Sequence, residues 1–85
     1  MTIRQIIVQY QLPVNIRKGM AMSFLGNYVR DEIFGVGNPN PFGKVEEDNT
    51  MVNDYPEELI PHVISLISEV IAEHPEWSIS GRASN

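Results

Sequence analysis

The sequence has two histidines and eleven carboxylates, which are side chains suited to acid–base catalysis or to binding a metal ion. His62 and His74 are twelve positions apart on, or just past, one expected helix, so they cannot share a metal without ligands from elsewhere. Glu58 lies near His62, and Glu73 precedes His74, but such pairs on a helix surface usually contribute about 0.5 kcal/mol or less and carry no chemistry. We therefore expect no catalytic residues, no metal site and no cofactor, and an enzyme is the least favoured class.

Two short motifs have the composition of ligand-binding loops without their full pattern. Gly35-Val36-Gly37 lacks the third glycine of a phosphate-binding G-x-G-x-x-G loop and follows an expected helix, so we interpret it as a turn. Glu46-Glu47-Asp48 is not embedded in calcium-loop spacing. We interpret it as a solvated acidic loop, with an acidic contact site or a divalent-ion ligand as the alternative.

The charges are sorted along the chain. Residues 1–30 carry four basic side chains and no acid, whereas residues 31–85 carry all eleven acids against Lys44 and Arg82, giving formal charges of +4 and −9. Bipolar charge acts by steering encounters with partners, and it indicates an interaction protein. Tyr10 and Tyr28 lie within the basic segment, as in some nucleic-acid binders, but the net charge of −5 disfavours nucleic acid as a partner. The four basic residues are Arg4, Arg17, Lys18 and Arg30.

The elements that would position these groups begin with an alternating segment. From Ile6 to Leu12, every second residue is apolar, which predicts a half-buried strand with Ile6, Val8, Tyr10 and Leu12 on the buried side. Residues 16–34 have helical periodicity, and Gly35 follows as a stop.

The polar half of the helix over residues 16–34 is rich in small side chains. An interior glycine costs a helix about 1 kcal/mol relative to alanine, so two of them call for a compensating reason. We interpret this half as a candidate contact surface, with an indifferent exposed face or internal packing as alternatives. It comprises Gly19, Ser23, Gly26, Asn27 and Arg30.

Beyond the loop at residues 35–43, the sequence predicts a strand or small hairpin over residues 44–52. Asp54 and Glu57 have the spacing of a capping box. In a helix that starts at Tyr55, Pro61 would fall in the interior and remove a hydrogen bond. We therefore expect a kink, or a short opening turn followed by a main helix from about Ile60 to Glu73. Residues 77–80 alternate weakly, as in a short strand, and residues 81–85 are expected to be a polar tail.

The acidic face expected on this last helix is a second candidate partner surface, with simple solubility as the alternative. It comprises Glu58, Glu69 and Glu73, continued by Glu76. Tyr55 and Trp77 flank the helix and are expected to cover the core, although aromatic residues of this kind are also favoured binding anchors.

An 85-residue chain with 42% apolar and 20% charged residues is expected to fold as one domain over residues 1–80. It has no cysteine, signal-peptide pattern or membrane-span pattern, and we expect a cytoplasmic location. The expected fold is α+β, with two amphipathic helices packed on a sheet of two or three strands in the order β-α-(β)-α-β.

The expected function is a small non-enzymatic protein-interaction module, an inhibitor or adaptor that binds and occludes a surface of a larger protein. Small phage and mobile-element regulators share this profile in type only. A structural homo-oligomer is the first alternative, because the basic and acidic segments of two copies could attract each other. A nucleic-acid-binding protein that uses the basic N-terminal segment is the second.

Overall fold

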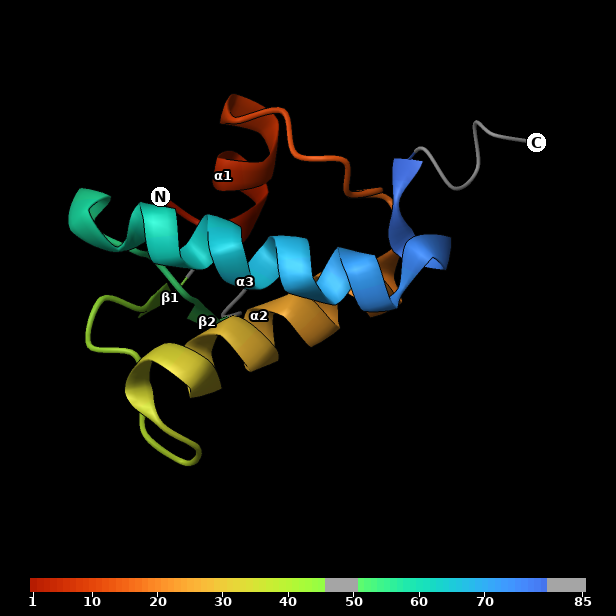
Figure 1. Ribbon diagram of the computed structural model, residues 1–85. Coiled ribbons are helices and arrows are strands. Elements are labelled where there is room, and N and C mark those ends of the chain that lie inside the picture. The colour runs from red at the N-terminus through yellow and green to blue at the C-terminus, as the bar shows by residue number, and fades with distance from the viewer. Residues whose placement is uncertain (46–50, 80–85) are drawn as a thin grey trace.

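The computed structural model describes residues 1–45 and 51–79, and this part of the chain is predominantly helical. Three α-helices dominate it: α1 (Ile3–Gln9), α2 (Gly19–Phe34) and α3 (Ile60–Glu73). Figure 1 shows α3 lying along α2, while α1 stands at a steep angle to both. Two 3₁₀ turns flank α3, η1 (Glu57–Leu59) before it and η2 (Pro75–Trp77) after it.

The only sheet among the described residues is a hairpin of two very short strands. β1 (Lys44–Val45) pairs antiparallel with β2 (Met51–Val52), with Lys44 opposite Val52. The predicted α+β fold, with helices packed on a sheet of two or three strands, is therefore wrong. The helices pack on one another instead, and each of the three contacts the other two.

The predicted N-terminal strand is the main error, because residues 3–9 form α1. Thr2 caps this helix: its hydroxyl accepts from the Gln5 amide at 3.2 Å, and the Gln5 side chain accepts from the Thr2 amide at 2.8 Å. Ile3, Ile6 and Ile7 have the i, i+3, i+4 spacing of one helical face and are buried, whereas Val8 is 59% exposed. Burial thus follows the helical period, and the capping box starts the helix.

The two longer helices were predicted correctly in type. α2 ends at Phe34, before Gly35, which has a φ of 97°. α3 has the predicted bounds, with η1 as the short opening turn, so Pro61 falls in the first turn of α3, where its missing N–H is tolerated. Among the described residues, the predicted strand at residues 77–80 is instead the end of η2 and an isolated bridge between Ser78 and Val14. Ser80 and the predicted tail at residues 81–85 lie outside the described residues.

The predicted capping box at Asp54 and Glu57 is also wrong. Asp54 forms ion pairs with the Met1 amino group and, at 3.4 Å, with Lys44 Nζ, and it accepts a hydrogen bond from the Tyr55 amide at 3.0 Å. The hydrogen bond from the Met1 amino group lowers the pKa of Asp54. Asp54 therefore links the residue before α1 to the segment that leads into η1. It does not cap the helix that follows it.

Tyr55 is the largest fully buried side chain, and its ring stacks on that of Phe34 with centroids 6.2 Å apart. Within the described residues its buried hydroxyl has no hydrogen-bond partner. Burial raises the pKa of Tyr55 to about 12, because the interior disfavours the phenolate. Tyr55 was predicted to cover the core, and it is buried as a part of the core.

The raised pKa of Tyr55 predicts alkaline destabilisation. The folded-state pKa lies above the value of about 10 in the unfolded chain, so this contribution to stability is complete below pH 10 and is lost as pH rises toward 12. Tyr55→Phe should therefore lose less stability than the wild type between pH 8 and pH 11, as measured by urea unfolding. At pH 8 it should be equal to the wild type or up to about 1 kcal/mol more stable, because an unpaired buried hydroxyl is removed. Identical losses in both proteins would contradict this assignment.

Candidate functional site

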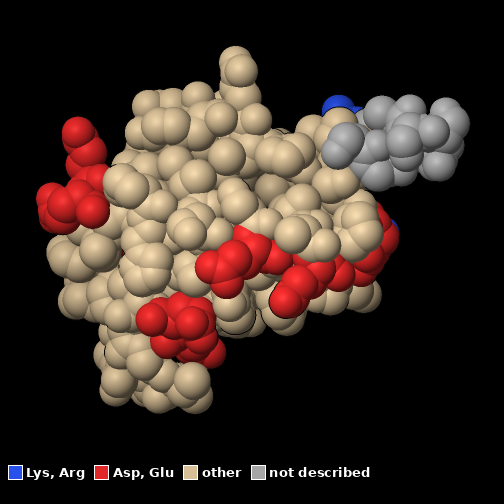
Figure 2. All heavy atoms as spheres, in the orientation of Figure 1, with Lys and Arg blue, Asp and Glu red and all other residues tan. Residues whose placement is uncertain are grey.

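An acidic face lies where α2 and α3 run together. Glu69 and Glu73 of α3 and Glu32 of α2 lie near enough to Tyr28 to act on it, and burial together with the charge of these three carboxylates raises the pKa of Tyr28. All three glutamates are exposed, and none forms an ion pair within the described part of the chain. Figure 2 shows acidic side chains gathered along this side of the molecule.

Aromatic rings adjoin the acidic face. Phe24 stacks on Tyr28 with ring centroids 5.7 Å apart and contacts Trp77 at 5.3 Å, and His74 stacks on Trp77 at 4.0 Å. Trp77 is only 6% exposed, so it covers the core, whereas Phe24 is 40% exposed. Phe24 is therefore the most exposed of the four rings, while Tyr28 and His74 are half-buried. We define the acidic face as Glu32, Glu69 and Glu73 together with Phe24 and Tyr28.

The structure separates the four predicted acidic residues. Glu69 and Glu73 lie one turn apart on α3, and Glu76 follows in η2. Glu76 pairs with His74 Nδ1 at 3.1 Å, and a backbone hydrogen bond and then His74 lower the pKa of Glu76. Glu58 lies in η1, at the opposite end of α3. Only Glu69 and Glu73 of this set thus contribute to the acidic face.

Most of the predicted small-residue surface lines a groove of about 700 Å³. Ser23, Gly26, Asn27 and Arg30 form the α2 side of this basic groove, and Arg4 and Lys44 add positive charge from α1 and β1. Gly19 does not line it. A Cβ added at Gly26 would meet no atom within 4 Å, which argues against internal packing as the reason for this glycine. That the small-residue surface of α2 contacts a partner stays a prediction.

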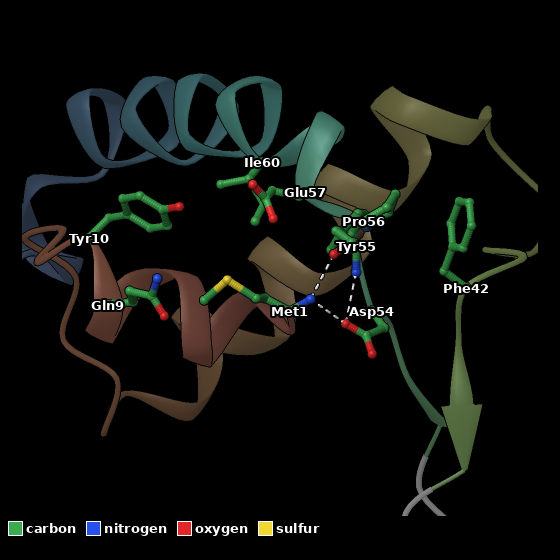
Figure 3. Close-up of a pocket in the computed structure, with 9 residues that line it drawn as sticks. All are labelled: Met1, Gln9, Tyr10, Phe42, Asp54, Tyr55, Pro56, Glu57 and Ile60. Carbon is green, nitrogen blue, oxygen red and sulfur yellow. Dashed lines mark hydrogen bonds and ion pairs between the residues drawn. The ribbon is translucent and has the colours of Figure 1, made fainter.

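A recess of about 600 Å³ lies between the C-terminal end of α1 and the start of α3 (Figure 3). Gln9 and Tyr10 contribute to it from α1 and its C-cap, Glu57 and Ile60 from η1 and α3, and Phe42 from the long loop. The remaining lining residues are Met1, Asp54, Tyr55 and Pro56. Sequence reasoning missed this recess. Tyr10 had been placed on the buried side of a strand, yet it is 44% exposed.

No group of three or more His, Cys, Asp or Glu side chains in residues 1–45 and 51–79 is arranged to hold a metal ion. The acidic cluster Glu46-Glu47-Asp48 lies outside these residues. None of the described helices combines the length and apolar character needed to cross a membrane. Comparisons with protein families, curated proteins and solved structures found no match to this chain.

Proposed function

We propose that this chain is a small, non-enzymatic protein-interaction module of the cytoplasm, an inhibitor or adaptor that binds and occludes a basic surface of a larger protein. The observation that carries the proposal is the acidic face, where Glu32, Glu69 and Glu73 lie near Tyr28 and have no ion-pair partners in the described residues. A partner lysine or arginine at this face would meet uncompensated negative charge.

The aromatic part of the acidic face supports the same proposal. Phe24 is 40% exposed and lies beside Tyr28, so a cation near the carboxylates would also contact an aromatic ring. Cation–π contacts of this kind contribute about 0.5–2 kcal/mol. Partly exposed aromatic side chains surrounded by polar residues are typical of protein interfaces. Both features favour a basic protein surface over a small-molecule substrate.

Charge reversal on the acidic face tests the proposal. A partner captured with the wild-type protein and identified by mass spectrometry should bind Glu73→Lys at least about tenfold more weakly, which corresponds to about 1.4 kcal/mol. The partner's on-rate for the wild type should also fall several-fold between about 50 and 500 mM salt, because exposed charges are screened.

Glu58→Lys is the matched control, because it changes the net charge equally but lies at the opposite end of α3. Its affinity should fall clearly less than that of Glu73→Lys, since Glu58 lies outside the acidic face and exposed charges are screened with distance. Equal losses in both variants would indicate a general charge effect, and no loss with Glu73→Lys would remove the acidic face from the interface.

The homo-oligomer alternative is favoured by one observation. The basic groove is lined by Arg4, Arg30 and Lys44, and Arg4 has no ion-pair partner in the described residues, whereas Arg30 pairs with Asp31 and Lys44 with Asp54. Arg4 could therefore attract the acidic face of a second copy, so that two copies join through unlike surfaces. Sedimentation equilibrium of the isolated chain distinguishes the alternatives: the adaptor proposal expects a monomer, whereas the homo-oligomer alternative expects an assembly that dissociates with salt.

A further inference from the structure

The recess in Figure 3 is lined by three exposed polar side chains that have no partner in the described part of the chain. The Gln9 amide, the Tyr10 hydroxyl and the Glu57 carboxylate line it, and none forms a hydrogen bond or ion pair with another described side chain or backbone group. Figure 3 shows the Tyr10 hydroxyl and the Glu57 carboxylate directed toward the same space, with Gln9 and Met1 at its other edge. The recess thus offers several hydrogen-bond acceptors that no group among the described residues uses.

The charge of the recess is set by Glu57. Asp54 also lines it, but the Met1 amino group and Lys44 already pair with that carboxylate. The Met1 amino group in turn also donates to the Tyr55 carbonyl at 2.7 Å. Glu57 is therefore the one carboxylate in the recess with no counterion among the described residues. An anionic ligand would be repelled by it, whereas a cation would be attracted.

Apolar groups form the remaining walls. Met1, Pro56 and Ile60 lie around the polar groups, and Phe42, 47% exposed, lies at the far side in Figure 3. These walls suit an alkyl chain that carries its charge at the end. The volume of about 600 Å³ falls within the range of roughly 300–1,000 Å³ usual for ligand sites.

We propose that this recess binds a primary ammonium group on an unbranched alkyl stem, namely the side chain of a lysine on the partner protein. An ammonium group has three donors that separate acceptors such as the Glu57 carboxylate and the Tyr10 hydroxyl can take up, whereas the planar fork of arginine favours a bidentate carboxylate. The assignment of the lysine to a partner rests on the proposed function. The preference for an alkyl ammonium group does not.

The probe for this site is Nα-acetyl-lysine N-methylamide, titrated into the ¹⁵N-labelled full chain and followed by NMR. We expect saturable shifts of the amides of Gln9, Tyr10 and Glu57. The Nε-acetylated form of the probe, which is uncharged, should bind at least about tenfold more weakly, because a charge-assisted hydrogen bond is lost. Pentylamine tests the source: binding as tight as that of the capped lysine would assign the site to free amines and overturn the lysine assignment.

Two variants locate the site. Glu57→Gln should weaken binding of the capped lysine at least about tenfold, while Glu58→Gln, an identical change one residue away that does not line the recess, should stay within about twofold of wild type. Circular dichroism checks that both variants fold. No saturable shift, equal binding of the Nε-acetylated probe, or equal affinity of Glu57→Gln and wild type would each overturn the proposal.

The test is separable from that of the acidic face, since Glu73 does not line the recess. If the capped lysine binds but Glu73→Lys does not weaken binding of the partner, the acidic face is refuted and the recess proposal stands. The reverse result would refute the recess alone.

Discussion

Replacing Ile7 with alanine is expected to lower the free energy of unfolding by about 2 to 5 kcal/mol, because the side chain is 3% exposed and its removal leaves a cavity in the core. Ile7 packs from α1 among residues of the other two helices. The change should be measured by urea denaturation, with the slope compared between variants to confirm two-state unfolding.

Val8→Ala is the matched control for the same helix. Val8 is 59% exposed, so its loss should change stability by no more than about 0.5 kcal/mol, and the better helix propensity of alanine offsets the lost contacts. A strand over Ile6–Leu12 would bury Val8 and expose Ile7, and it would reverse the order of the two variants. If Val8→Ala lowers the free energy of unfolding more than Ile7→Ala does, the assignment of α1 as a helix is therefore refuted.

Gly35→Ala is expected to destabilise the protein by about 1 to 3 kcal/mol, because its φ of 97° lies in a region that residues with a Cβ rarely adopt. An added Cβ would also lie 2.7 Å from Asn38 Nδ2, which donates to the Phe34 carbonyl at 2.9 Å at the end of α2. The substitution thus strains the backbone and displaces a side chain that satisfies the helix terminus. Thermal unfolding monitored by circular dichroism measures the loss.

Gly26→Ala serves as the control, because Gly26 lies inside α2 whereas Gly35 follows its end, and the effect should have the opposite sign. Gly26 lies inside α2, and an added Cβ there meets open space. Alanine should therefore stabilise α2 by up to about 1 kcal/mol through its helix propensity. Destabilisation by both substitutions would show that glycine is needed at position 26 within the folded chain itself.

How well the sequence predicted the fold depended on the length of each helix. Over α3, apolar residues recur at helical spacing for fourteen residues, which fixes the type of the element and, with Pro61 and Pro75, its bounds. α1 has only seven residues, or about two turns, so its helical spacing at Ile3, Ile6 and Ile7 is brief and competes with the longer alternation from Ile6 to Leu12. The decisive local signal was Thr2-x-x-Gln5, a capping box that starts the helix.

The candidate surfaces were predictable only in part, and for a physical reason. Glu69 and Glu73 are four residues apart, so helix geometry alone places them together. Glu32 and Phe24 join them through the packing of α2 against α3, which no local pattern specifies. The recess depends even more on tertiary structure, since Tyr10 and Glu57 belong to different elements far apart in the sequence.

The two isolated bridges have a consequence for the order in which the chain folds. Thr2 pairs with Asp54 and Val14 with Ser78, and backbone hydrogen bonds from Tyr55 to Met1 at 2.8 Å and from Asn15 to Trp77 at 2.9 Å reinforce them. Each joins segments that most of the chain separates, so the loop-closure entropy must be overcome before these contacts form. Because these contacts are non-local, folding should be slower than in a bundle whose helices pair only locally.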